Sequence, residues 1–185
     1  MGKIALIVGP HAVGKTSLFN YAKRKNEVLV FDGYRIPVEN LDLSKTNEFI
    51  EYQIKYLDRI NMNNRDIKES EKHGFVNRSI EESGYYFHFH EKHDKLEEWY
   101  SKELNKEENI KVDLVIYLDA NHEALKERYS NDIYRDVVEN TEWYRNEYSR
   151  YVKYWKNYKN VIIVDTTNKT TKDVYHQVMS KLKEV

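Results

Sequence analysis

The residues with the most distinctive chemistry form one short segment near the N-terminus, Gly9-Pro10-His11-Ala12-Val13-Gly14-Lys15-Thr16. It satisfies G-x-x-x-x-G-K-[ST] at every fixed position, a pattern typical of phosphate-binding loops. The glycines let the backbone curve around phosphates, Lys15 brings a positive charge to the β and γ oxygens, and the Thr16 hydroxyl can bind Mg²⁺. We therefore expect ATP or another nucleoside triphosphate, with Mg²⁺, to bind these residues: Gly9, His11, Ala12, Val13, Gly14, Lys15, Thr16 and Ser17.

The segments on either side of this phosphate loop (residues 9–16) suit the same ligand. An apolar run at 3–8 predicts a strand before the loop, and residues 17–22 have helical character after it. The loop would therefore end at a helix N-terminus, where unpaired backbone N–H groups and the helix dipole favour an anion. The context supports phosphate binding as much as the pattern does.

Five short apolar runs predict the strands of one sheet. Most are continuous rather than alternating, which is typical of strands buried on both faces, and long helical stretches separate them. This arrangement predicts an α/β fold with a mainly parallel sheet and helices on both faces. The runs are 3–8, 27–31, 74–76, 112–118 and 161–164.

Residues at helical spacing predict three of the helices, while the polar stretch 61–73 fits either a long loop or a helix end. The chain has no internal repeat and no Pro- or Gly-rich linker, so we expect residues 1–185 to form a single domain. The three spaced sets are Phe49, Tyr52, Tyr56 and Ile60; Tyr144, Tyr148, Tyr151, Trp155 and Tyr158; and Val174, Val178 and Leu182.

Charge and composition narrow the class of partner. The 30 Lys and Arg residues nearly balance 31 Asp and Glu, which gives no bulk electrostatic reason to expect nucleic acid or an anionic membrane. Cysteine is absent, which excludes a thiolate metal site and a cysteine nucleophile and fits a reducing compartment. No apolar run approaches the ~20 residues that cross a bilayer. We therefore expect a cytoplasmic protein with a small-molecule partner.

Among proteins with a phosphate loop, a kinase needs the least additional machinery. A GTPase would need Asn-Lys-x-Asp, but residues 168–171 read Asn-Lys-Thr-Thr. A mechanical ATPase would show Asp-Glu after an apolar strand, whereas Asp119 and Asp165 are each followed by another residue type. Phosphoryl transfer to a bound acceptor depends mainly on positioning, cations and Mg²⁺, which a chain of this size can supply.

A second segment, from Phe75 to Phe87, resembles the thymidylate kinase and deoxynucleoside kinase superfamily. Thymidylate kinases carry an Asp-Arg-Tyr turn followed by Ser and an Ala-Tyr-Gln step, and Arg78, Ser83 and Tyr86 occupy those places. Deoxynucleoside kinases carry Glu-Arg-Ser and a later aromatic residue, which Arg78, Ser79 and Phe87 match. The resemblance implies that Arg78, Ser83 and Tyr86 contact the acceptor.

The sequence departs from both patterns at Asn77, because the families carry a carboxylate there. An amide oxygen can bind Mg²⁺ but brings no charge to it. Asp32, after the second predicted strand, is our candidate to compensate, as a ligand of Mg²⁺ or of the acceptor, with Arg35 nearby as a second cation for the acceptor. The predicted metal ligands are therefore Thr16, Asp32 and Asn77.

A third segment resembles the superfamily's strand, helix and arginine-bearing lid. It runs from Leu118 through Arg128, and the lid is expected around 128–137 with Arg135 closing over the transferred phosphoryl group. Residues 161–168 resemble the last strand and the loop that borders the adenine base. Taken over nearly the whole chain, the resemblance implies a three-layer P-loop kinase fold whose five parallel strands follow the order 2-3-1-4-5.

These observations predict an ATP- and Mg²⁺-dependent kinase that phosphorylates a nucleoside monophosphate, as a thymidylate kinase does. Its expected catalytic residues are Lys15, Asp32, Arg78 and Arg135. Two alternatives stay open: a deoxynucleoside kinase, in which Asp32 takes the proton of a 5′-hydroxyl, and a regulatory nucleotide-binding module that has lost catalysis. A homodimer through the helix bearing Tyr52 and Tyr56 is also left open.

Overall fold

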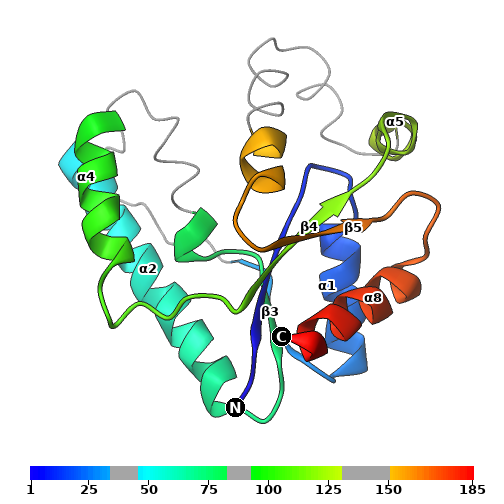
Figure 1. Ribbon diagram of the computed structural model, residues 1–185, viewed down its shortest axis with the longest axis horizontal. Helices are drawn as coiled ribbons and strands as arrows, with labels where there is room; N and C mark the ends of the chain where they lie inside the picture. Colours follow the sequence, from blue (N-terminus) through cyan, green and yellow to red (C-terminus); the bar gives the residue numbers. More distant parts are fainter. Residues whose placement is uncertain (34–45, 83–92, 131–150) are drawn as a thin grey trace.

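The computed structural model describes residues 1–33, 46–82, 93–130 and 151–185, and its centre is a five-stranded sheet (Figure 1). All strand pairs given by the register are parallel, and the order is β2-β3-β1-β4-β5, as predicted. Parallel strands put all their carboxyl ends at one edge, so the phosphate loop after β1 lies near the ends of β3 and β4. The strands are β1 Ile4–Val8, β2 Leu29–Phe31, β3 Gly74–Val76, β4 Leu114–Asp119 and β5 Val161–Asp165.

Helices pack on both sides of the sheet (Figure 1). α1 (Lys15–Lys25) and α8 (Thr171–Glu184) contact each other and cover one face. The end of α2 (Thr46–Glu69) and the helical segment 151–156 contribute to the other face, and α4 (His93–Leu104) lies beside α2 (Figure 1). α5 (His122–Ser130) follows β4. The architecture is therefore the three-layer α/β arrangement that the apolar runs predicted.

The central strand β1 explains why its sequence is apolar without alternation. Ala5 and Ile7 pack in the core beneath α1 and α8, whereas Ile4, Leu6 and Val8 pack in the core on the opposite face. All five side chains are buried because both faces are covered. This rigid central strand fixes the point at which the phosphate loop begins.

The polar stretch 61–73 continues a helix as far as Glu69, which decides the alternative that the sequence left open. Two of its three asparagines make tertiary hydrogen bonds: Asn61 Nδ2 donates to Asn109 Oδ1 at 2.6 Å, and Asn64 Nδ2 donates to the Ile110 carbonyl at 2.7 Å. Ile67 in the same stretch is fully buried. Some of the polar residues of this stretch thus bind the segment before β4.

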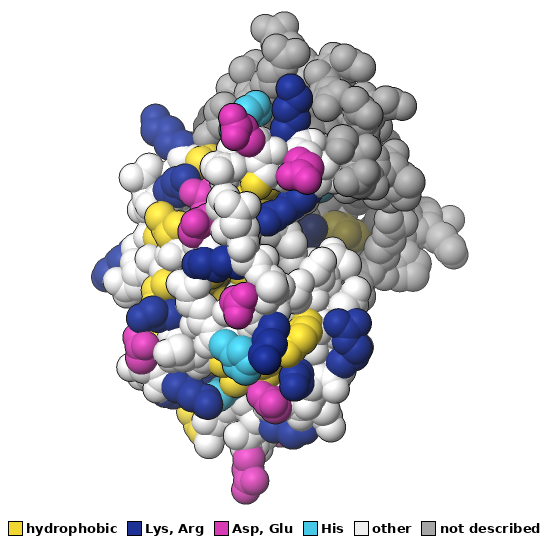
Figure 2. Space-filling view, turned by 90° about the vertical axis from the view of Figure 1, so that its right-hand side faces the viewer, with side chains coloured by type: hydrophobic (Ala, Val, Ile, Leu, Met, Phe, Trp, Pro, Cys, Tyr) yellow, Lys and Arg dark blue, Asp and Glu magenta, His cyan; other side chains and the backbone are white. Residues whose placement is uncertain are grey.

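The face that carries α1 and α8 shows Lys and Arg side chains interspersed with Asp and Glu (Figure 2). Among the described residues on this face no large patch of a single sign stands out (Figure 2). No helix in the described ranges is both long and apolar enough to cross a membrane. The described part of this face thus agrees with the near balance of charge in the composition.

Candidate nucleotide-binding site

The phosphate loop joins the end of β1 to the start of α1, as the sequence predicted. Its backbone has positive φ at Gly9 (146°), Ala12 (57°) and Gly14 (101°), while Val13 is buried in the core and anchors the loop. Gly14 caps α1 without any side-chain hydrogen bond, and the first turn of α1 contains no acidic residue. The N–H groups of this turn are therefore available to an anion, with the helix dipole in its favour.

The two loop glycines give a first prediction, because their surroundings differ. A Cβ on Gly9 would lie 2.5 Å from the Leu118 carbonyl oxygen, whereas a Cβ on Gly14 would meet nothing within 4 Å. We expect Gly9→Ala to cost about 2–3 kcal/mol of stability, from strain and overlap together, and Gly14→Ala about 1–2 kcal/mol from backbone strain alone. Urea denaturation of both variants measures the difference; equal costs, or the reverse order, would contradict this packing.

Lys15 lies at the centre of the loop, half-buried at the first residue of α1. Its ammonium group donates to the Gly9 carbonyl and, at 2.8 Å, to the Pro10 carbonyl. The pKa of Lys15 is lowered to about 8, mainly by burial. The nearby Arg78 guanidinium also lowers this pKa, whereas the Glu82 carboxylate opposes the shift. Lys15, Arg78 and Glu82 therefore form one electrostatic cluster beside the loop.

Arg78 follows β3, and its Nη1 donates to Glu82 Oε1 at 2.8 Å. Glu82 is only 4% exposed, and burial raises its pKa, which the charge and hydrogen bond of Arg78 oppose. The structure brings Arg78 and Lys15 close enough to influence each other, as a shared phosphate site requires. Glu82 was not predicted from the sequence; its spacing of four residues from Arg78 suits an ion pair on a helix but does not indicate its burial.

The two other described candidates, Asp32 and Asn77, lie where adjacent strands end. Asn77 Nδ2 donates to the Asp32 carbonyl at 3.1 Å, which ties the end of β3 to the end of β2. The Asp32 carboxylate pairs with Lys23 of α1 at 2.7 Å. Within the described ranges no group of three or more His, Cys, Asp or Glu residues is arranged to hold a metal ion. Four further candidates lie outside the described residues: Arg35, Ser83, Tyr86 and Arg135.

Thr166, after β5, connects the phosphate loop to the β4 end. Its hydroxyl lies 3.2 Å from the Val13 carbonyl and 2.9 Å from the Asp119 carbonyl, and it is 3% exposed. Arg128, in the last turn of α5, donates to the hydroxyl and to the carbonyl of Thr166. The loop after β5, expected to border the base, is therefore fixed to the phosphate loop by a buried hydroxyl.

A second support comes from the helical segment 151–156. The Gly9 N–H donates to the Tyr151 hydroxyl at 3.2 Å, and Lys156 pairs with Asp119 at 2.5 Å. Tyr151 packs on Trp155, with ring centroids 6.3 Å apart. Neither contact was predicted from the sequence, because the residues involved are far apart in the chain.

Solved structures share this arrangement over almost the whole chain. A deoxyadenosine kinase from M. mycoides, solved with the products dCMP and dCDP, is 20% identical with a TM-score of 0.63 and covers 99% of this chain and 100% of its own. A thymidylate kinase from Candida albicans is 16% identical with a TM-score of 0.63, covering 99% of this chain and 92% of its own. The chain has the P-loop nucleoside and nucleotide kinase fold.

A third structure with this kinase fold, a Bacillus subtilis protein in complex with phosphorylated GDP, is 12% identical with a TM-score of 0.55 and covers 98% of this chain and 96% of its own. No protein-family model matches the sequence, and the search of curated proteins finds no match. The predicted three-layer P-loop kinase fold, with strand order 2-3-1-4-5, is confirmed by the observed sheet and by the solved structures that share it.

Glu81, next to Glu82 in this kinase fold, gives a prediction about pH. It is 5% exposed, accepts the Val112 N–H through Oε1 at 3.2 Å, and has a buried Oε2 without a hydrogen-bond partner. Burial raises the pKa of Glu81, so the folded state binds its proton more readily than the unfolded state does. The free energy of unfolding should therefore fall as pH rises above the unfolded-state pKa of about 4.3 for glutamate.

Glu81→Gln removes this titration, and we expect the variant to be about 1–2 kcal/mol more stable than the wild type at pH 8, with the difference vanishing toward pH 4. Chemical denaturation across this pH range measures it. Glu98→Gln, on the exposed side of α4, serves as the control and should leave the difference between pH 5 and pH 8 unchanged. A stability difference between Glu81→Gln and the wild type that shrinks as pH rises would contradict a raised pKa of Glu81.

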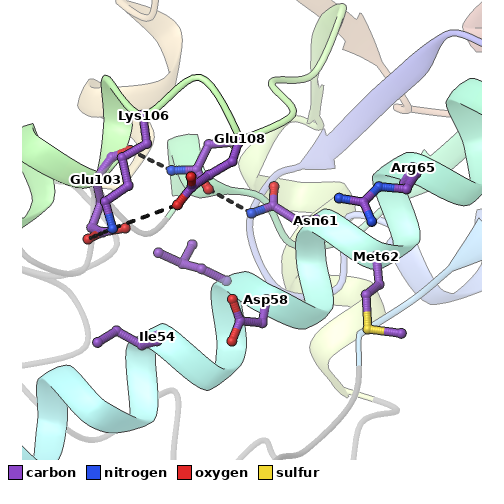
Figure 3. Close-up of a pocket in the computed structure, with 10 residues that line it drawn as sticks. Ile54, Asp58, Asn61, Met62, Arg65, Glu103, Lys106 and Glu108 are labelled. Carbon is purple, nitrogen blue, oxygen red and sulfur yellow. Dashed lines mark hydrogen bonds and ion pairs between the residues drawn. The ribbon is translucent and has the colours of Figure 1, made fainter.

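A pocket of about 420 Å³ lies between α2 and the residues that end and follow α4 (Figure 3). Its charged lining includes Asp58, Arg65 and Lys106, and Lys106 pairs with Glu103 at 2.6 Å (Figure 3). None of the lining residues belongs to the phosphate loop or to the strand ends. The pocket is therefore separate, in its residues, from the nucleotide-binding site.

Proposed function

We propose that this protein transfers the γ-phosphoryl group of ATP to a small acceptor, a nucleoside monophosphate, in a reaction that requires Mg²⁺. The observation that carries the proposal is the phosphate loop between β1 and α1, with Lys15 and Arg78 brought together beside it. The likeness to deoxyadenosine and thymidylate kinases, at 20% and 16% identity, supports the same class of reaction.

Each described residue has a role that its position supports. The N–H groups of the loop and of the first turn of α1 would bind the β- and γ-phosphates, and Lys15 would move from the Gly9 and Pro10 carbonyls to phosphate oxygens. The exposed Thr16 hydroxyl would bind Mg²⁺, which supplies charge neutralisation across the phosphates when it is bound. Arg78 would bind the acceptor phosphate and stabilise charge on the transferred group.

In the transfer, an acceptor phosphate oxygen forms a bond to the γ-phosphorus while the bond from that phosphorus to the β–γ bridging oxygen breaks. The products are ADP and a nucleoside diphosphate. A monophosphate oxygen is already ionised at neutral pH, so no general base is needed, and cations such as Arg78 suffice. The cluster beside the phosphate loop fits this need for cations, because two of them, Lys15 and Arg78, lie near a single carboxylate, Glu82.

A second candidate acceptor is a nucleoside 5′-hydroxyl, and Asp32 is the observation that favours it. Its carboxylate follows β2 at the edge of the sheet where the site lies. A hydroxyl must lose its proton during transfer, and a carboxylate within reach could accept it. The similarity to a deoxyadenosine kinase over 99% of the chain points in the same direction.

The deciding experiment measures ADP release from Mg-ATP with a panel of nucleosides and nucleoside monophosphates. Stimulation by a monophosphate, with Arg78→Ala raising the KM for that acceptor, would support the proposal. Stimulation by a nucleoside, with Asp32→Asn lowering kcat at an unchanged acceptor Kd, would select the hydroxyl acceptor instead. A flat panel from protein that still binds Mg-ATP would reject both and favour a regulatory nucleotide-binding module.

A further inference from the structure

The end of β3 carries no carboxylate of its own. Asn77 stands there, and its side-chain nitrogen is used to donate to the Asp32 carbonyl at 3.1 Å. Arg78 comes next, and it forms an ion pair with Glu82, on the short helical segment 80–82. Arg78 is therefore paired with a carboxylate four positions after it, Glu82, whereas the residue before it, Asn77, offers none.

We infer that Glu82 is a positioning residue: its carboxylate holds the Arg78 guanidinium at the phosphate loop, where Asn77 supplies no charge. The inference rests on the proposed function and names one further residue of the same site. Nothing in the pattern of the phosphate loop or of the Asn-Arg-Ser turn pointed to this glutamate.

The geometry suits a rigid anchor for a more exposed partner. Glu82 is 4% exposed, so packing restricts its side chain, whereas the Arg78 side chain is 36% exposed. The two are joined by a charge-assisted hydrogen bond of 2.8 Å between Nη1 and Oε1. A guanidinium has five N–H donors, so it can bind a carboxylate on one edge and a phosphate on another.

The charges support the same role. The second carboxylate oxygen, Glu82 Oε2, is buried and has no hydrogen-bond partner, an arrangement that is costly unless cations lie near. Two do: Arg78 makes the hydrogen bond, and Lys15 of the phosphate loop interacts with the same carboxylate through space. Glu82 thereby offsets the repulsion between Lys15 and Arg78 and lets both cations remain beside one loop.

Glu81 provides a matched comparison. It is buried to a similar extent and has one unpartnered oxygen, but its described bond goes to the Val112 N–H before β4. Its pKa is raised mainly by burial, and the charge that opposes this shift is Lys111, outside the cluster at the phosphate loop. A variant at Glu81 thus reproduces the loss of a buried carboxylate without touching the cluster at the phosphate loop.

The test is a double-mutant cycle with Glu82→Gln, Arg78→Ala and the double variant, using Glu81→Gln as the control. With Mg-ATP saturating, we expect Glu82→Gln to lower kcat/KM for the acceptor at least about tenfold in the wild-type background and less than about twofold when Arg78 is already alanine. Mg-ATP affinity should change less than about threefold, a split that general destabilisation would not produce.

A second readout does not depend on turnover: NMR of the Arg78 guanidinium, labelled with ¹⁵N in the full chain. Its side-chain signals should report slower rotation in the wild type and in Glu81→Gln than in Glu82→Gln. If the wild type releases no ADP with any acceptor, the proposed function fails, and this signal then decides the inference by itself. A guanidinium that rotates as slowly in Glu82→Gln as in the wild type overturns it.

Equal losses from Glu82→Gln in both backgrounds, or a loss no larger than that from Glu81→Gln, would likewise overturn the inference. Glu82→Asp keeps the negative charge on a side chain that is shorter by one methylene. It takes the place of Glu82→Gln in the cycle if Glu82→Gln does not fold. We expect it to lower kcat/KM about fivefold, again only where Arg78 is present.

Discussion

Replacing Lys15 by alanine is expected to lower acceptor-dependent ADP release by about 10³-fold. The side chain is the only cation inside the phosphate loop sequence, and the structure places it at the first residue of α1, bonded to the Gly9 and Pro10 carbonyls. In the proposed reaction its ammonium group stabilises charge on the transferred phosphoryl group, and the loop contains no other lysine or arginine that could replace it. Steady-state rates with the best acceptor of the panel measure the loss.

The same substitution should weaken binding of Mg-ATP by about 10- to 100-fold, the worth of one charge-assisted hydrogen bond. Titration calorimetry of the variant measures this directly. Lys25→Ala, in the last turn of the same helix and so at its opposite end, is the matched control and should change both quantities less than about twofold. A Lys15→Ala variant that keeps more than a tenth of the wild-type rate would contradict the assigned role.

Trp155→Ala is expected to reduce the free energy of unfolding by about 3–5 kcal/mol. Trp155 is fully buried, and its indole packs against the rings of Tyr154 and Tyr158, at centroid distances of 5.0 and 5.2 Å. It belongs to the same core cluster as Ile4 and Leu6 of β1. Its removal would leave a large cavity between the helical segment 151–156 and the sheet.

The Trp155 variant should also bind Mg-ATP more weakly, because the same helical segment carries Tyr151, whose hydroxyl accepts the Gly9 N–H. Guanidinium denaturation gives the loss of stability, and calorimetry gives the loss of affinity. Trp155→Phe keeps an aromatic ring and removes a buried N–H that has no partner, so its cost should be about 1–2 kcal/mol. A cost below 1 kcal/mol for the alanine variant would contradict the packing.

The sequence alone was sufficient for the phosphate loop, because its chemistry depends on eight consecutive residues whose backbone is set by local glycines. It was also sufficient for the strands. Both faces of β1 are buried, and the continuous apolar run that results can be recognised as a strand from the sequence, without knowledge of the neighbouring strands. The order 2-3-1-4-5 followed from the resemblance that these motifs carry, and the parallel register confirms it.

The acceptor side of the site could be predicted only in part. Arg78 was identified through its turn, but the sequence pointed to Asp32 as the compensating carboxylate, and the structure pairs Asp32 with Lys23. Glu82 was passed over because one glutamate in a chain with 31 acidic residues carries no local signal. Its significance arises from burial, which surrounding elements impose and which the four-residue spacing to Arg78 does not reveal.

What the sequence determined by itself is the local chemistry and the fold that carries it: a phosphate loop after the first strand of a parallel sheet. Only the tertiary structure decided which distant groups support that loop. Thr166 reaches the Val13 carbonyl across 153 positions, and the Tyr151 hydroxyl reaches the Gly9 N–H across 142. Such contacts depend on parallel strands bringing their carboxyl ends to one edge, and no spacing along the chain encodes them.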